Sequence, residues 1–250
     1  MKILFIIFFI ISFINCTFDA CANQKIQSFY EAKNILEEII YKQVPAQTLY
    51  CDYEFSQQTK IVQLPENFYV KNNSKYTDKI EWEHVVPVEN FGRTFEEWRT
   101  GSPLCVDKKG ISYKGRRCAE KVNKEFRLMV ADMYNLYPTV AIVGTLRSNY
   151  DFIQFSEDTP SSFGDCEMKI YNKKAEPPDH AKGLVARVYL YMEQQYPRFK
   201  MSKSQKNLMD KWDKKYPISK EECLRTKLIE EIQGNENSIV KNLCIHNVLW

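Results

Sequence analysis

The sequence predicts one α+β domain that is mainly helical and stabilised by disulfide bonds. Several long segments repeat apolar residues at the helical period, a shorter region alternates apolar runs with turn residues, and 8 cysteines are present. With 250 residues, of which 44% are hydrophobic, the chain is long enough for one substantial core. Glycine is scarce and no low-complexity tract occurs, which excludes a disordered or fibrous protein.

Helices are expected over residues 28–41, 119–136, 179–195, 203–214 and 220–232. Their apolar residues recur three and four positions apart, Ser28 is placed to cap the first helix, and Pro138 and Gly234 stop two others. Two or three short strands are expected within residues 49–70, and one over residues 80–86. No internal repeat or linker interrupts the chain, so one domain is the simplest description.

The N-terminus has the pattern of a secretory signal peptide over residues 1–22. Lys2 precedes an apolar run from Ile3 to Ile14, which is shorter than the roughly 20 residues that a membrane span needs. Ala20-Cys21-Ala22 is similar to a cleavage site, which assigns residues 23–250 to the mature domain, without stable membrane association. An uncleaved anchor is the alternative, and cleavage nearer Cys16 also stays open.

Export would place the cysteines in an oxidising compartment, where they are expected to form disulfides. Cleavage after Ala22 leaves six, which are Cys51, Cys105, Cys118, Cys166, Cys223 and Cys244. Six cysteines allow three disulfides in fifteen pairings, and spacing alone does not choose among them. Pairing of Cys105 with Cys118 would close a loop rich in cations. No C-x-x-C pair occurs, so a zinc or redox site has little support.

The loop between Cys105 and Cys118, called the basic loop below, is a candidate nucleic-acid surface. Its cations are Lys108, Lys109, Lys114, Arg116 and Arg117. The formal net charge of the chain is only +3, which permits a polyanionic partner where cations cluster but does not require one. Cations that contact phosphates give affinity without reading sequence. A merely solvated loop is the alternative.

His84 stands in the segment Glu81-Trp82-Glu83-His84-Val85-Val86-Pro87 and is one of 3 histidines in the chain. A His beside a Glu is more often a structural pair than a catalytic one. On a regular strand the two side chains would point to opposite faces, so Glu83 and His84 share a site only where the strand bends or ends. Pro87 indicates that an end is near. There, one residue would hold a metal and the other would move a proton.

A second cluster is Asp132-Met133-Tyr134-Asn135-Leu136. On the helix expected over residues 119–136, Asp132 and Asn135 share a face. Magnesium takes oxygen ligands, keeps several waters and uses only one or two carboxylates. Glu83 and Asn135 are therefore candidate magnesium ligands. The alternative is a surface aspartate followed by an asparagine that ends the helix.

These two segments, with Arg147-Ser148-Asn149, closely resemble the endonuclease I family of periplasmic and secreted bacterial DNases. The similarity continues in the same order through residues 177–178, 186–192, 212–217 and 232–235, so it spans nearly the whole mature chain. The resemblance implies a ββα-metal (His-Me finger) fold, in which two strands and a helix form the active-site unit.

The resemblance also implies the roles of individual residues. Glu83 and Asn135 are expected to bind one Mg ion, and His84 is expected to act as general base on a water molecule. An imidazole, with an ordinary pKa near 6.5, suits proton transfer at neutral pH. Arg116 best matches the family's phosphate-contacting arginine, which precedes a cysteine. Lys114, Arg117 and Arg147 are expected to bind the substrate.

The activity implied is non-specific hydrolysis of DNA phosphodiester bonds by a secreted or periplasmic monomer, leaving 5′-phosphate ends. RNA as a further substrate stays open. The chain departs from the family at Asp52-Tyr53 and before the Glu81 segment, where two cysteines are missing, which fits the loss of one disulfide. Tyr134 and Gly144 replace a family histidine and asparagine.

Those substitutions motivate a second hypothesis, a secreted nucleic-acid-binding protein with little activity. The intact set of Glu83, His84 and Asn135 favours the enzyme. A zinc hydrolase is excluded by the lack of a second histidine at ligand spacing.

Overall fold

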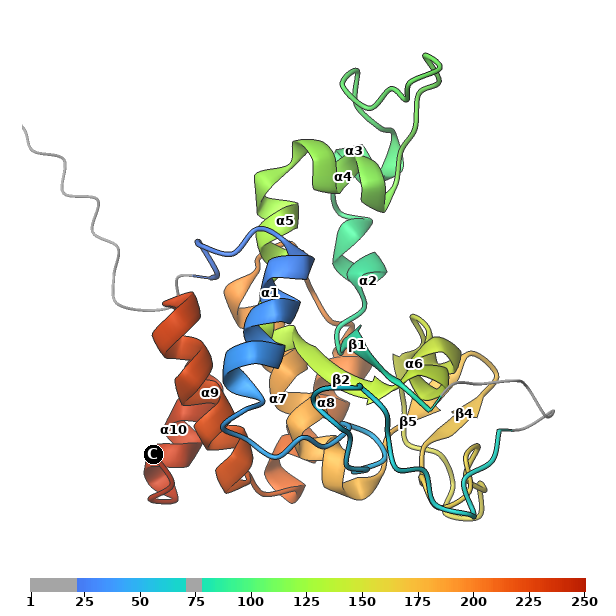
Figure 1. The fold of residues 1–250 in the computed structure, drawn as a ribbon, viewed down its shortest axis with the longest axis vertical. Helices are drawn as coiled ribbons and strands as arrows, with labels where there is room; N and C mark the ends of the chain where they lie inside the picture. Colours follow the sequence, from blue (N-terminus) through green and yellow to red (C-terminus); the bar gives the residue numbers. More distant parts are fainter. Residues whose placement is uncertain (1–21, 71–77) are drawn as a thin grey trace, which may run out of the picture.

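A two-stranded antiparallel ribbon lies at the centre of the computed structural model, which describes residues 22–70 and 78–250 (Figure 1). Strand β1 (Ile80–His84) pairs with β2 (Leu136–Val140), and His84 lies opposite Leu136. The strand expected near residue 80 is therefore confirmed. Strand β2 was not expected, because all five of its residues are buried and they lack the alternation that marks a half-buried strand. The expected signal peptide lies almost entirely outside the described residues.

Helices cover this ribbon and the rest of the core (Figure 1). Helix α6 (Ala141–Arg147) follows β2 directly and packs on both strands of the ribbon. The remaining helices before α7 are α1 (Phe29–Ile35), the π-helical turn η1 (Leu36–Ile40), α2 (Val88–Gly92), α3 (Glu96–Arg99), α4 (Arg116–Val122), α5 (Lys124–Val130) and the 3-10 turn η2 (Met133–Asn135). Ser28 caps α1 as expected, with its hydroxyl accepting from the Glu31 N–H.

The single helix expected over residues 119–136 is wrong. The chain leaves helical geometry at Asn123, whose φ of −110° and ψ of 114° are extended. The Asn123 side chain then accepts a hydrogen bond from the Phe126 N–H at 3.0 Å and caps α5. Asp132 caps the 3-10 turn in the same way, through the Tyr134 N–H. Two capping residues therefore divide a segment whose apolar spacing alone indicated one helix.

The short strands expected within residues 49–70 are also wrong as regular strands. This region forms isolated bridges, such as Phe55 with Val62, and not a ladder. A small sheet lies later in the chain instead, in the order β3 (Asp151–Phe152), β5 (Lys174–Glu176), β4 (Lys169–Tyr171). The segment's apolar residues, including Phe55, Val62 and Phe68, are buried, so their spacing reflects packing.

The C-terminal helices agree with the sequence prediction. They are α7 (Asp179–Gln195), α8 (Lys203–Lys215) and α9 (Lys220–Gln233), followed by α10 (Ser238–His246), which was not expected. Gly234 ends α9 in the left-handed conformation, with a φ of +83°. The described residues form a mixed, mainly helical single domain, and none of their helices has the length and apolar character needed to cross a membrane.

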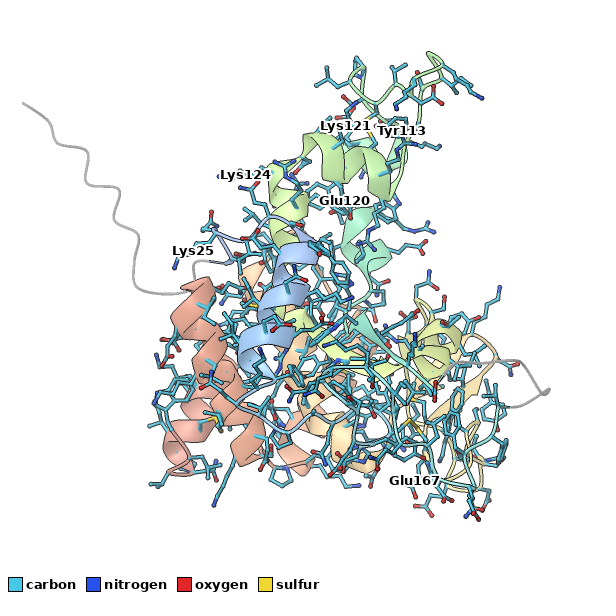
Figure 2. All side chains as sticks on the ribbon, viewed as in Figure 1. Lys25, Tyr113, Glu120, Lys121, Lys124 and Glu167 are labelled. Carbon is cyan, nitrogen blue, oxygen red and sulfur yellow. A yellow bond between two sulfur atoms is a disulfide. The ribbon has the colours of Figure 1, made fainter. Side chains whose placement is uncertain are left out.

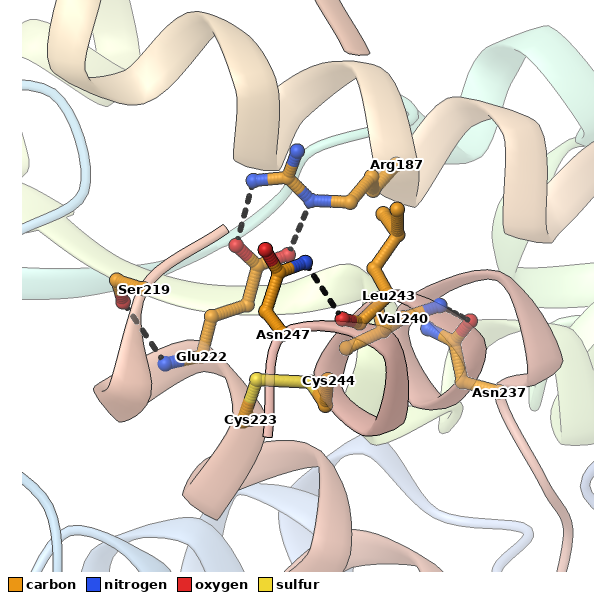
Figure 3. Close-up of a disulfide and its surroundings, with 9 residues drawn as sticks. All are labelled: Arg187, Ser219, Glu222, Cys223, Asn237, Val240, Leu243, Cys244 and Asn247. Carbon is orange, nitrogen blue, oxygen red and sulfur yellow. Dashed lines mark hydrogen bonds and ion pairs between the residues drawn. A yellow bond between two sulfur atoms is a disulfide. The ribbon is translucent and has the colours of Figure 1, made fainter. Parts of the chain in front are cut away.

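All six expected cysteines form disulfides, in the pairs Cys51–Cys166, Cys105–Cys118 and Cys223–Cys244. The second pair closes the basic loop, as proposed from the sequence. The third joins α9 to α10, beside the buried ion pair between Arg187 and Glu222 (Figure 3). The disulfides therefore fasten the peripheral segments to the core.

We predict that replacing Cys223 and Cys244 together by alanine lowers the free energy of unfolding by about 2–4 kcal/mol, because the unfolded chain regains the entropy of the open loop. Urea unfolding of the oxidised wild type and the double variant measures this difference. An unchanged free energy of unfolding would contradict it, and wild type under reducing conditions provides a second comparison.

Candidate active site

Glu83 and His84 line one open pocket of about 390 Å³ at the end of the ribbon. Its other lining residues include Arg116, Thr139, Gly144 and Asn149. Strand β1 ends at His84, so the chain turns there and brings neighbouring side chains to one site, as the sequence analysis required. A larger cavity, of about 1120 Å³, is lined by Glu176 and Lys215, among others. Neither Glu83 nor His84 lines it.

The His84 ring is fixed by contacts on two sides. Its Nε2 lies 2.8 Å from the Val130 carbonyl oxygen, which only accepts hydrogen bonds, so Nε2 carries the proton of the neutral ring. The Phe29 ring stacks on it, with ring centroids 5.2 Å apart. Nδ1 is therefore the basic nitrogen. Burial, with smaller contributions from Arg116 and Arg147, lowers the pKa of His84 to about 3, against the opposing effect of the hydrogen bond with the Val130 carbonyl.

The two oxygens of Glu83 have different surroundings. Oε1 accepts hydrogen bonds from the Tyr50 hydroxyl at 2.8 Å and pairs with Arg147 Nη1 at 3.0 Å. Oε2 is buried and has no hydrogen-bond partner among the described residues. Burial raises the pKa of Glu83, although Arg147, Tyr50 and the nearby Thr139 hydroxyl oppose this. One oxygen is thus held by the protein, and the other is left for a ligand.

Arg147 does not lie where a substrate-binding cation was expected. Its side chain is fully buried behind Glu83, and its guanidinium donates to the carbonyl oxygens of His84 and Val85 at 3.2 and 2.5 Å. It also donates to the Tyr189 hydroxyl at 3.3 Å. Arg147 therefore fixes the end of β1 and the Glu83 carboxylate from inside the core.

The structure does not bring Asn135 to Glu83. Asn135 is fully buried, its Oδ1 accepts from the Val86 N–H at 2.7 Å, and its Nδ2 donates to the Val86 carbonyl at 3.0 Å. Both ends of the amide are therefore occupied by the backbone that follows β1. The expectation of a metal ligand rested on the family resemblance and on a helical face shared with Asp132, and the 3-10 turn η2 replaces that helix.

Arg116, the expected phosphate-contacting arginine, lies at the pocket that Glu83 and His84 line. It is the first residue of α4, its side chain is 43% exposed, and it lines the same pocket as His84. Its Nε donates to Glu120 at 2.7 Å, and its guanidinium lies 5.9 Å from the centre of the Phe29 ring. A phosphate in the pocket would therefore meet a cation close to His84.

Lys114 and Arg117 are exposed on the basic loop and are absent from the pocket lining. Arg117 stacks on Tyr113, with its guanidinium 4.1 Å from the ring centre. Figure 1 shows the loop projecting beyond α3 and α4, and Figure 2 labels Tyr113, Glu120 and Lys121 at its base. These cations can extend a binding surface outward from the pocket, but they do not face the reacting groups.

Sequence reasoning missed Tyr50, Val130 and Thr139, which complete the site. Tyr50 and the Val130 carbonyl orient the two candidate functional groups, and Thr139 lines the pocket from β2. Nothing in the sequence around them marks these roles, because each depends on which segments the fold places beside β1. Recognition of β2 would have placed Thr139 opposite Glu81.

The residues present fit a hard cation with a small set of protein ligands. The described residues contain no group of three or more His, Cys, Asp or Glu side chains that could hold a metal. A single carboxylate oxygen, Glu83 Oε2, is buried without a partner next to the space beside Gly144. Magnesium commonly uses one or two carboxylates and keeps several waters, so this donor set suits it.

We predict that His84 stays neutral well below pH 6, because burial penalises its charged form. An NMR titration of the ring signals measures its pKa, and the His84→Ala spectrum identifies them. Since the folded-state pKa is depressed, His84 also reduces stability as the pH falls through its unfolded pKa of about 6.5 toward 3. A His84 titration near pH 6.5 would contradict the burial.

A family model and individual relatives all assign the chain to the same family of nucleases. The sequence model of the Endonuclease I family matches residues 28–244. The chain is 34% identical over 224 residues to Endonuclease-1 of Buchnera aphidicola subsp. Acyrthosiphon pisum, covering 88% of this chain and 82% of the relative. It is 33% identical over 225 residues to an extracellular deoxyribonuclease of Aeromonas hydrophila, covering 87% and 91%. A periplasmic deoxyribonuclease of Aeromonas hydrophila is 32% identical over 227 residues, covering 88% of each chain. The chain therefore belongs to the endonuclease I family.

Proposed function

We propose that the protein is an extracellular or periplasmic endonuclease that hydrolyses phosphodiester bonds of DNA. The observation that carries this is one pocket holding a neutral imidazole with a free basic nitrogen, a carboxylate oxygen without a partner, and an arginine. The printed names of the relatives, extracellular and periplasmic deoxyribonucleases, support DNA as substrate and export as destination. Three disulfides fit the same oxidising environment.

His84 is the proposed general base. Its Nδ1 would take a proton from a water molecule while the Val130 carbonyl keeps the ring oriented through Nε2. A pKa of about 3 keeps the ring in its base form at neutral pH. An anionic phosphodiester entering the pocket raises that pKa, because an opposite charge favours the protonated ring. The base therefore becomes stronger when substrate is present.

Glu83 Oε2 is the proposed protein ligand of a magnesium ion. A bound ion would neutralise charge on the phosphate and on the departing oxygen. Arg147 and Tyr50 keep the Glu83 carboxylate aimed at the pocket, and Arg116 would add a charge-assisted hydrogen bond to the phosphate. In this proposal β1, β2 and α6 form the ββα-metal unit, and Asn135 stabilises the backbone after β1 instead of binding the ion.

The basic loop is the proposed contact with the DNA backbone beyond the cleaved bond. Its Lys108, Lys109, Lys114 and Arg117 side chains are exposed, and the loop leads directly to Arg116 at the pocket. Contacts of this kind read charge and not base sequence, which suits a non-specific enzyme. The product would carry 5′-phosphate ends, and end-labelling after digestion tests this chemistry.

We predict that His84→Ala lowers the rate of plasmid nicking by about 10²–10⁴-fold, which is the usual contribution of a general base. The assay compares oxidised wild type, His84→Ala and His180→Ala with magnesium and with EDTA. His180 is exposed at the start of α7, outside the pocket, so its variant should cut like wild type.

Two outcomes would contradict this prediction. Equal cutting by His84→Ala would remove His84 from the role of base. No cutting of DNA or RNA by folded wild type would favour a nucleic-acid-binding protein on the same scaffold. Circular dichroism of each variant separates a chemical loss from a folding loss.

We predict that alanine at Lys108, Lys109, Lys114 and Arg117 weakens DNA binding and lowers its salt dependence. If each cation contacts one phosphate, the slope of log K against log salt concentration should fall in magnitude by about 3–4. Binding is measured on a His84→Ala background in EDTA, so the DNA stays intact. A matched control removes four exposed cations of α8 and α9: Lys203, Lys211, Lys214 and Lys220. Equal slopes in both variants would exclude the basic loop as the footprint.

A further inference from the structure

We propose that the turn of residues 147–150, at the end of α6, binds the DNA backbone, and that the Ser148 hydroxyl donates a hydrogen bond to a phosphate oxygen there. The inference rests on the proposed DNA substrate. It adds a contact from a neutral group, separate from Arg116 and the basic loop. Ser148 belongs to the segment Arg147-Ser148-Asn149 that the sequence analysis singled out, and the site described so far uses only Arg147.

The turn has a backbone conformation that normally belongs to glycine. The Tyr150 N–H donates to the Arg147 carbonyl oxygen at 3.1 Å, and Ser148 follows Arg147 with a φ of +52° and a ψ of −131°. These values are those of the first central position of a type II′ turn, where φ is positive and glycine dominates. Glycine would adopt this conformation with less strain, because it has no Cβ atom. The serine therefore needs an explanation other than the turn itself.

The position of this strained residue supplies one. The described residues include six non-glycine residues with positive φ, and of these only Ser148 lines the pocket of Glu83 and His84. Strained backbone persists where the surrounding structure fixes it, and it is concentrated at binding and catalytic sites. Here the Ser148 N–H donates to the Gly144 carbonyl at 3.0 Å, and the Ser148 carbonyl accepts from Arg147 Nη1 at 3.4 Å. The guanidinium that holds Glu83 thus also holds this turn.

The Ser148 hydroxyl is exposed and only weakly bonded to the protein. Among the described residues its Oγ donates to Asn149 Oδ1 alone, at 3.5 Å, which is the outer limit of a hydrogen bond. Asn149 itself is held from its other end, because its Nδ2 donates to the Glu89 carboxylate. A phosphate oxygen is charged and therefore a stronger acceptor than this distant amide oxygen. The hydroxyl can turn to a phosphate with little loss.

The charges around the turn suit a neutral contact. Glu89 also lines the pocket, and its hydrogen bond with Arg93 lowers its pKa, so the Glu89 charge is present but paired. The last turn of a helix carries partial negative charge, which Arg147 compensates in α6. Serine hydroxyls commonly contact DNA phosphates. A phosphodiester in the pocket would therefore meet a cation from α4, Arg116, and a neutral donor from the end of α6, Ser148.

Two substitutions separate the hydroxyl from the backbone conformation. Ser148→Ala removes the hydroxyl and keeps the strain, whereas Ser148→Gly removes the hydroxyl and relieves the strain. Asn172→Gly is the matched control. Asn172 also has a positive φ, of +48°, but it is exposed between β4 and β5 and does not line the pocket.

Binding to a short DNA duplex is measured on the His84→Ala background in EDTA, so that neither cleavage nor a metal ion contributes. We expect both Ser148 variants to weaken binding by about three- to tenfold, the usual effect of one hydrogen bond. The slope of log K against log salt concentration should not change, because a neutral hydroxyl releases no counterion. Arg116→Ala should instead lower the magnitude of that slope by about 1. Asn172→Gly should bind like the His84→Ala protein.

Thermal unfolding provides a readout that a purely structural role would move in the opposite direction. Ser148→Gly should unfold at or above the Tm of the His84→Ala protein while it binds DNA less well, because relief of strain favours the folded state. A residue that only shapes the turn would lose binding together with stability.

The outcomes distinguish this inference from the proposed function. Unchanged binding in Ser148→Ala would overturn the hydroxyl contact, and a loss confined to Ser148→Gly would assign the effect to backbone conformation. A lower salt slope in both Ser148 variants would assign it to displaced cations and also overturn the contact. If the Ser148 variants bind DNA normally while wild type cuts it, the proposed function stands and this inference fails. If the folded His84→Ala protein binds no DNA and wild type cuts none, the proposed function itself fails.

Discussion

The buried ion pair between Arg147 and Glu83 is the interaction on which the rest of the site depends. Arg147 is fully buried, and its Nη1 lies 3.0 Å from Glu83 Oε1. The same guanidinium binds the carbonyl oxygens of His84 and Val85, so one side chain from α6 holds both the carboxylate and the end of β1. Removing one partner of such a pair leaves an uncompensated buried charge, at a cost of about 3–5 kcal/mol. Arg147 is therefore a positioning residue that acts through Glu83.

In this arrangement each of the two candidate functional side chains, Glu83 and His84, has one polar atom bonded by the protein and one that is not. Tyr50 and Arg147 occupy one oxygen of Glu83, and the Val130 carbonyl occupies one nitrogen of His84. The remaining oxygen and nitrogen belong to residues of one pocket, with Arg116 at its wall. Because the protein satisfies only half of each group, the other half keeps its chemical capacity at a defined place. This differs from a structural Glu–His pair, in which both groups would be fully bonded.

The sequence predicted the parts of this fold that local patterns determine. The Ser28 cap, β1, α7, α8, α9 and the Gly234 stop all follow from spacing and capping residues, and their boundaries agree closely. The motif around His84 also indicated that a strand ends near Glu83 and His84, and β1 ends at His84. Failures occurred where burial removed the pattern. Strand β2 is buried along its whole length, so it was not recognised, and the expected helix ran up to its first residue, Leu136. Because β2 was not predicted, Asn135 was assigned to the face of a helix, whereas it lies in the 3-10 turn η2.

Arg147 shows the other limit of sequence reasoning. From the family resemblance Arg147 was expected to bind the substrate, yet the fold buries it as the partner of Glu83. Nothing local separates an exposed arginine from one that neutralises a carboxylate 64 positions earlier, since that depends on the packing of α6 against the ribbon.

An anomalous-scattering map from crystals of the mature protein soaked in Mn²⁺ tests most directly whether Glu83 binds a cation in the pocket. We predict one strong peak in the pocket, bound to Glu83 Oε2, with His84 Nδ1 free of the metal. A peak bound to Asn135, or a pocket without a peak while Mn²⁺ is bound elsewhere, would contradict it.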